Sequence, residues 1–330
     1  MIKNRITRRE FSKLLTASAA TAGMGTTLAR AQQNYPSRPV RFVLPFAAAG
    51  VADITARLAA EKLGDKLGQR FVVENVPGPG GIAAARAVLS QPADGYTVGL
   101  VTNGTAISVA IYRSLPFDPV MDFAPISLIG NFDLVFASNA ESEFKTLQDF
   151  LAGARAQPGR LNVGTIAVGS TQHLGAELFK GLAGLNFQIV PYRTTPDVIV
   201  ALLRNDIQLM VDFYGPMKSN LLDNKIRPVA VSGPQRSPFL TDVPTAAEAV
   251  PGYEVTSWNG MFAPVGTPPD IISLLNRSIH EIVAIPEVKQ RYAELGIEAK
   301  ASTPEEVKTR LEADIKKWAA LIERAGIQKL

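Results

Sequence analysis

The sequence predicts an α/β fold of two domains, each built on a mostly parallel sheet flanked by helices. Strand-like runs alternate with amphipathic helical segments, and this alternation is typical of doubly wound sheets. The pattern starts a second time near residue 131. The chain has 330 residues, which is more than one hydrophobic core usually serves and fits two domains of ordinary size.

Residues 1–31 have the composition of an export signal and are set apart from the fold. A basic start is followed by an uncharged, weakly apolar stretch at 14–28 and by Ala29-Arg30-Ala31, a typical cleavage site. Within it, TRREFSK at 7–13 matches the twin-arginine export pattern. We therefore expect a periplasmic protein. An amphipathic membrane-surface helix is the alternative, but the stretch at 14–28 has no charged face.

The rest of the chain is nearly neutral and lacks thiols. Six of the 34 basic and one of the 30 acidic side chains lie in residues 1–31, which leaves 28 basic and 29 acidic groups. This balance argues against nucleic acid as a partner. The absence of cysteine excludes disulfides, thiolate metal sites and a lipid anchor on cysteine. No later run of apolar residues is long enough to span a bilayer. We expect a freely soluble monomer.

The first half contains three predicted strands and two predicted helices. The strands lie at 40–44, 71–74 and 97–101. The first helix is expected to turn Ile54, Leu58, Leu63 and Leu67 inward, and the second covers 82–89, after a glycine loop.

The second half repeats the alternation and ends in three helices. Strands are predicted at 134–137, 161–166, 187–190, 208–211 and 227–231, and helices at 147–156 and 196–204. The last tail helix has the clearest start, with Thr303 as N-cap, Pro304 next and Glu306 closing a capping box. Its apolar stripe consists of Val307, Leu311, Ile315, Trp318 and Ile322.

Two loops, at 46–53 and 167–172, have the features of anion sites. Each joins the carboxyl end of a predicted strand to a helix N-terminus, and each is rich in small residues. Small side chains leave backbone N–H groups accessible, and these donors add to the positive end of the helix dipole. Because ligands of open α/β sheets bind outside the carboxyl ends of strands, each loop could hold one carboxylate across a cleft. An ordinary tight connection is the alternative for either loop alone.

The sequence contains no strong catalytic motif. GxSxG and phosphate-binding loops are absent, and the glycines at 78–81 have the wrong spacing for a dinucleotide site. With only two histidines, no metal site and no cofactor are predicted. Ser170 and His173 could act as nucleophile and base. Alternatively, Ser170 or Thr171 caps the helix and His173 is a partly buried polar residue, while His280 lies on a helix surface.

Several segments carry a family resemblance that extends over nearly all of the chain after residue 31. They are PFAAAG at 45–50 with Asp53, Ala56 and Arg57, VVENVPGPGG at 72–81, PADGYT at 92–97, LPFDP at 115–119, GSTQHL at 169–174, VPYR at 190–193, VPT at 243–245, PGYE at 251–254, WNG at 258–260 and APVGTP at 263–268. Together these segments resemble the Bug or TctC-like extracytoplasmic solute receptors of tripartite tricarboxylate transporters.

The resemblance implies a two-lobed periplasmic-binding-protein (Venus-flytrap) fold. Domain 1 would comprise residues 32–134 and 258–330, and domain 2 residues 135–257. Such a receptor is not an enzyme. It would capture a small carboxylate, whether a dicarboxylate, an amino-dicarboxylate or an aromatic acid, and deliver it to a membrane permease. The alternatives are a sensor that docks on a membrane histidine kinase and a secreted hydrolase that uses Ser170 and His173.

The resemblance also implies a set of ligand-binding residues in the two loops and near them, with Asp53 capping the first helix. The set is Phe46, Ala47, Ala48, Ala49, Gly50, Asp53, Gly169, Ser170, Thr171, His173, Tyr192, Thr194, Thr195 and Asp212. Two departures alter the pocket: the family usually has two glycines where Ala49-Gly50 stands, and a glycine near Thr194-Thr195-Pro196. Side chains in place of glycine restrict the backbone, so ligand identity does not carry over. Phe46, Tyr192, Phe213 and Tyr214 would suit an apolar or aromatic acid, or would belong to the core.

Overall fold

The computed structural model describes residues 35–46, 48 and 50–330. The predicted export signal at 1–31 lies outside the described residues, as do Ala47 and Ala49 of the first loop. Within the described part, no helix is long and apolar enough to cross a membrane.

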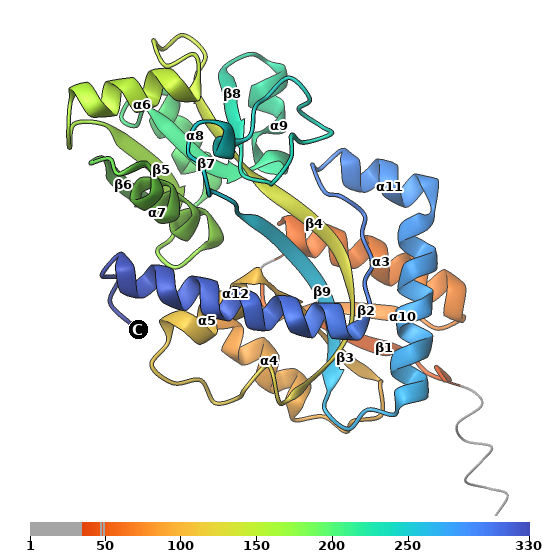
Figure 1. The fold of residues 1–330 in the computed structure, drawn as a ribbon. Coiled ribbons are helices and arrows are strands. Elements are labelled where there is room, and N and C mark those ends of the chain that lie inside the picture. Colours follow the sequence, from red (N-terminus) through yellow and green to blue (C-terminus); the bar gives the residue numbers. More distant parts are fainter. Residues whose placement is uncertain (1–34, 47, 49) are drawn as a thin grey trace, which may run out of the picture.

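The described residues form one continuous nine-stranded sheet, in the order β2-β1-β3-β9-β4-β7-β5-β6, with β8 paired to β4 (Figure 1). The strands are β1 Val40–Leu44, β2 Phe71–Asn75, β3 Thr97–Thr102, β4 Phe123–Asn139, β5 Asn162–Ile166, β6 Gln188–Tyr192, β7 Leu209–Phe213, β8 Ile226–Val231 and β9 Thr256–Pro264.

Helices cover the faces of this sheet, most of them as connections between successive strands (Figure 1). They are α3 Val51–Leu67, α4 Ile82–Leu89, α5 Asn103–Ile111, α6 Leu147–Ala156, α7 Thr171–Ala183, α8 Thr195–Leu203, α9 Tyr214–Leu222, α10 Pro269–Ala284, α11 Pro286–Ala293 and α12 Pro304–Arg324. The helices at 82–89 and 147–156 begin and end at the predicted residues.

Two long strands divide the molecule into lobes. Strands β1, β2 and β3 are parallel, as are β5, β6 and β7, whereas β4 and β9 run antiparallel to their neighbours and to each other. The first part of β4 pairs with β9 and the remainder with β7 and β8. We call β1–β3 with α3–α5 and α10–α12 the first lobe, and β5–β8 with α6–α9 the second. The residue boundaries of the two domains remain predictions.

Helix α3 confirms the prediction for Leu63, which is buried, and for Leu58 and Leu67, which pack partly buried against apolar clusters, but not for Ile54. Ile54 is 40% exposed, and the buried apolar stripe consists of Ala56, Ala59, Ala60 and Leu63. These positions are spaced i, i+3, i+4 and i+7, so they share one side of the helix. The prediction for Ile54 was wrong because it followed the large apolar residues, while alanines form most of the packed face.

Helix α12 confirms the predicted capping box and apolar stripe. The Thr303 hydroxyl accepts from Glu306 N over 3.2 Å, and the Glu306 carboxylate accepts from Thr303 N over 2.8 Å. In Figure 1 the helix lies beside α5 and runs past the second lobe, with contacts to α5, β4 and α7. Its apolar face belongs to a large hydrophobic cluster that includes side chains of both lobes, such as Val101 of β3 and Leu209 of β7.

Replacing Thr303 by alanine should lower the free energy of unfolding by about 1 kcal/mol, because the first turn of α12 loses its side-chain acceptor. Chemical denaturation measures the change. The matched control is Thr309→Ala, an exposed threonine inside the same helix, where alanine is the better helix former and should not destabilise. Equal losses for both variants would contradict the capping role.

Candidate functional site

Helix N-termini gather at the carboxyl ends of the parallel strands. Helices α3 and α5 follow β1 and β3 in the first lobe, and α7, α8 and α9 follow β5, β6 and β7 in the second. The carboxyl ends of parallel strands meet at one edge of a sheet, so the helices that follow them begin there as well. Each N-terminus presents N–H groups that have no partner within its helix.

Several contacts bring the N-termini of the two lobes together. Asn103, the first residue of α5, donates from Nδ2 to Oγ1 of Thr171, the first residue of α7, over 3.0 Å. On the other side, a Cβ on Gly215 in α9 would lie 3.7 Å from Val51 Cγ2 at the start of α3. Within the first lobe, the Phe46 ring, in the loop before α3, would lie 3.9 Å from a Cβ on Gly104 of α5. The predicted loops thus belong to one neighbourhood.

The start of α7 has the geometry of an anion site. Ser170 is its N-cap, and Ser170 Oγ accepts from His173 N over 3.1 Å. The N–H groups of Thr171 and Gln172 have no acceptor among the described residues. Gly169, just before the cap, has a φ of 81°, which favours glycine. Two open donors at the positive end of a helix suit a carboxylate.

The start of α3 is arranged differently from the prediction. Gly50 occupies the N-cap position, and Asp53 lies in the first turn of the helix. The Asp53 carboxylate is buried and accepts from Arg57 Nε over 3.0 Å and from Asn75 Nδ2 over 2.8 Å. Asn75 also donates to the carbonyl of Phe46 over 3.0 Å. Asp53 therefore links α3 to β2 and, through Asn75, to the loop that contains Phe46.

Asp212 joins three helix N-termini in the second lobe. This residue of β7 is 1% exposed and accepts from Gln172 Nε2 over 2.8 Å, from Thr195 Oγ1 over 2.5 Å and from Phe213 N over 2.7 Å. Burial raises the pKa of Asp212, and these three donors oppose the shift. Gln172 is in α7, Thr195 begins α8 and Phe213 is the N-cap of α9. The carboxylate thus fixes the three helices relative to one another.

Ser170 and His173 do not form a nucleophile-base pair in this structure. The Ser170 hydroxyl accepts from the backbone N–H of His173 and donates to the carbonyl of Ile166 over 3.4 Å. Among the described residues the buried His173 Nδ1 has no partner, and burial lowers the pKa of this imidazole. The geometry is that of the structural alternative, in which Ser170 caps the helix and His173 is a buried polar residue.

The remaining predicted residues lie around this neighbourhood. Thr194 is exposed and caps α8 by accepting from Asp197 N over 3.4 Å. Tyr192 packs partly against the apolar core of the second lobe, and burial raises the pKa of its phenol. Phe46, Ala48 and Gly50 are exposed. Ligand contact by these residues stays a prediction.

Sequence reasoning missed three residues that organise the site, namely Asn75, Asn103 and Gln172. Each is an amide whose partners lie on other elements. One signal was available for Asn103: Thr102-Asn103-Gly104 follows a strand directly, as the two recognised loops do. His280 is exposed as predicted, with Nε2 3.2 Å from the Ser302 carbonyl oxygen.

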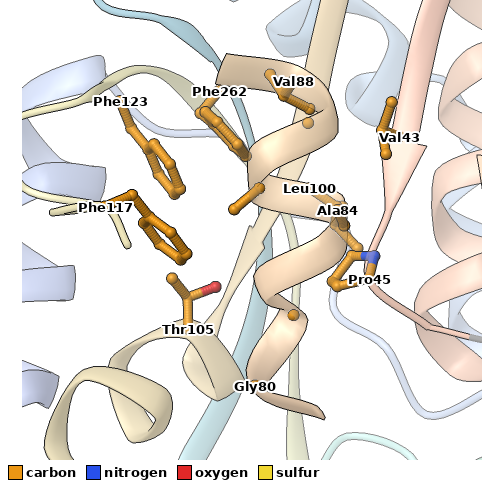
Figure 2. A pocket seen from close by; sticks show the side chains of 13 residues that line it. Val43, Pro45, Gly80, Ala84, Val88, Leu100, Thr105, Phe117, Phe123 and Phe262 are labelled. Carbon is orange, nitrogen blue, oxygen red and sulfur yellow. The ribbon is translucent and has the colours of Figure 1, made fainter. Parts of the chain in front are cut away.

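A small cavity in the first lobe has too little room for an organic acid. Figure 2 shows the side chains that line it around α4, with Val43 on one side of this helix and Phe123 and Phe262 on the other. Its volume is about 20 Å³, which is room for a single water molecule. A shallower groove of about 600 Å³ lies on the outer edge of this lobe, along β2 and α3. The helix N-termini remain the candidate site.

Comparison with known proteins identifies carboxylate-bound structures of similar fold. Rpa4515 of R. palustris, solved with adipate, is 35% identical with a TM-score of 0.80, covering 90% of this chain and 100% of that one. MatC of Rhodopseudomonas palustris, solved with bound malate, is 29% identical with a TM-score of 0.75, covering 87% and 100%. These likenesses confirm the predicted two-lobed binding-protein fold.

Sequence comparison gives the family directly. Protein BugT of Bordetella pertussis is 31% identical over 310 residues, which cover 93% of this chain and 94% of BugT. The model of the tripartite tricarboxylate transporter family receptor, TctC, matches residues 55–327. The chain therefore belongs to the TctC family of solute-binding receptors, as the segments that carried the resemblance predicted.

Proposed function

We propose that this protein is a periplasmic receptor that binds a small dicarboxylate between the N-termini of α3 and α7 and passes it unchanged to a membrane permease. The observation that carries the proposal is the open first turn of α7, held beside the first lobe by the Asn103–Thr171 hydrogen bond. The N–H groups of Val51 and Ala52 in α3 likewise have no acceptor among the described residues. Each lobe then supplies donors for one carboxylate.

Two donor sets favour a ligand with two anionic ends. A helix N-terminus stabilises a negative charge by roughly 0.3–1 kcal/mol, and more in a partly buried geometry. The acids bound to the related structures, adipate and malate, both carry two carboxylates. The exposed ring of Phe46 would cover the aliphatic part of such an acid, and an aromatic acid or amino-dicarboxylate is the alternative.

The binding test uses residues 32–330 and a panel of adipate, malate, glutamate and benzoate in thermal-shift and calorimetric titrations. A bound acid at about 100 times its dissociation constant should stabilise the protein by roughly 2.7 kcal/mol. Adipamide is the matched control, because it keeps the chain length of adipate and lacks both charges. No shift with any acid, or an equal shift with adipamide, would contradict the proposal.

A further inference from the structure

Three polar side chains form a buried hydrogen-bond chain from α12 to the N-terminus of α7. Trp318 Nε1 donates to Asn103 Oδ1 over 2.8 Å, and Asn103 Nδ2 donates to Thr171 Oγ1 over 3.0 Å. Trp318 and Asn103 are each 1% exposed, and Thr171 is 8% exposed. This hydrogen-bond chain leads from α12 in the first lobe to the first turn of α7, which is the candidate anion site of the second lobe.

The chemistry of the three groups fixes the direction of this chain. An indole N–H can only donate, so the oxygen of the Asn103 amide must face Trp318. The NH₂ group of Asn103 therefore faces Thr171, and this assignment follows from the bonding partners. The Thr171 oxygen accepts from Asn103, while its one hydroxyl proton has no acceptor within the described part of the chain. That proton is a free donor beside the open N–H groups of Thr171 and Gln172.

We propose that Asn103 and Trp318 are positioning residues that hold the Thr171 hydroxyl as a donor to a carboxylate oxygen of the ligand. The inference rests on the proposed function and adds a source of selectivity. One of the two lone pairs of the Thr171 oxygen accepts from Asn103, so the hydroxyl can turn its proton toward the ligand, beside two N–H groups that can only donate. An ionised carboxylate has only acceptors and matches all three, whereas an amide nitrogen turned toward them would leave donors unpaired.

A double-mutant cycle tests this relay, by which we mean the hydrogen-bond chain from Trp318 through Asn103 to Thr171. Trp318→Phe removes the N–H and keeps an aromatic ring, and Thr171→Val removes the hydroxyl at similar volume. We expect Trp318→Phe to weaken binding of adipate, or of malate if malate binds the unmodified protein more tightly, about three- to tenfold. In the Thr171→Val background, Trp318→Phe should cause no further loss. Thr171→Ser keeps the hydroxyl and should retain most of the affinity.

The second tryptophan is the matched control for packing. Trp258 is fully buried, and its indole donates to Asp314 Oδ2 over 2.7 Å, away from Thr171. Trp258→Phe should show no coupling to Thr171→Val. Losses from Trp318→Phe that are equal with and without the Thr171 hydroxyl would overturn the relay and leave Trp318 a packing residue.

A ligand-free measurement separates failure of the relay from failure of the proposed function. The chain has two tryptophans, so its ¹⁵N–¹H spectrum has two indole signals, and Trp318→Phe assigns them. Asn103→Ala should move the Trp318 signal and leave that of Trp258 in place. An unmoved Trp318 signal overturns the relay even if adipate binds. A moved signal in a protein that binds no acid shows that the bond exists and overturns its role in ligand selectivity.

Discussion

Replacing Asp212 by alanine should lower both the stability of the protein and its affinity for carboxylates. The substitution removes the common acceptor of Gln172, Thr195 and Phe213 N, and leaves buried donors without partners. We expect the free energy of unfolding to fall by about 2–4 kcal/mol, since each unsatisfied buried group is costly. Adipate affinity should fall by roughly tenfold or more, because the starts of α7, α8 and α9 lose their shared anchor.

Denaturation and calorimetric titration of the same samples measure the two effects. Asp242→Ala is the matched control, because Asp242 is an exposed carboxylate in the same part of the chain. It should change the free energy of unfolding by less than about 0.5 kcal/mol. If Asp212→Ala binds adipate as tightly as the unmodified protein does, Asp212 does not organise the site.

Asp133→Asn should alter how stability depends on pH. Asp133 lies on β4 opposite Thr256 of β9, between the two lobes. Burial raises the pKa of Asp133 to about 6. Nearby Glu298 and Glu254 also raise it, whereas a hydrogen bond with Thr256 and the charge of Arg310 lower it. In an unfolded chain the pKa of aspartate is about 3.9.

The sign of the pH dependence follows from the number of protons bound in the folded and the unfolded state. Between pH 4 and 6 the folded protein retains a proton on Asp133 that the unfolded chain has released, so stability falls as pH rises through this window. A pKa that is roughly two higher in the folded protein than in the unfolded chain contributes about 2–3 kcal/mol to the free energy of unfolding at low pH. This contribution is fully lost above pH 6. Asn cannot ionise, so the Asp133→Asn variant should gain about that much relative to the unmodified protein between pH 4 and 7.

Denaturation curves at pH 4, 5, 6 and 7 measure this change. Asp65→Asn is the matched control, because Asp65 is an exposed carboxylate on α3. The difference in free energy of unfolding between Asp65→Asn and the unmodified protein should stay nearly constant from pH 4 to pH 7. A constant difference for Asp133→Asn as well would show that Asp133 ionises normally in the folded protein.

The strand-helix units were predictable because short strands and amphipathic helices have a local signal. The 17-residue strand β4 was not, and only the segment 134–137 was predicted. Pro125 and Gly130 interrupt its sequence, and both lie at register shifts in the pairing with β9. A bulge accommodates residues that regular pairing disfavours, so a strand can continue through a proline and a glycine that give no local signal of one.

The candidate site was predictable only in part, for a different reason. Small residues after strands identified the loops before α3 and α7, since that pattern is local. The polar links that arrange these loops join residues far apart in the chain: Asn103 and Thr171 are 68 positions apart, and Asn103 and Trp318 are 215 apart. No periodicity or spacing in one sequence indicates such a pair.

The sheet shared by both lobes has a consequence for how the protein loses its structure. Strand β4 contributes residues to both lobes, and the large hydrophobic cluster contains Val101 of the first lobe, Leu209 of the second and Trp318 of α12. Melting one lobe alone would expose apolar surface of the other and leave half of β4 without a partner. Heating should therefore give a single calorimetric transition, so that the whole molecule behaves as one cooperative folding unit.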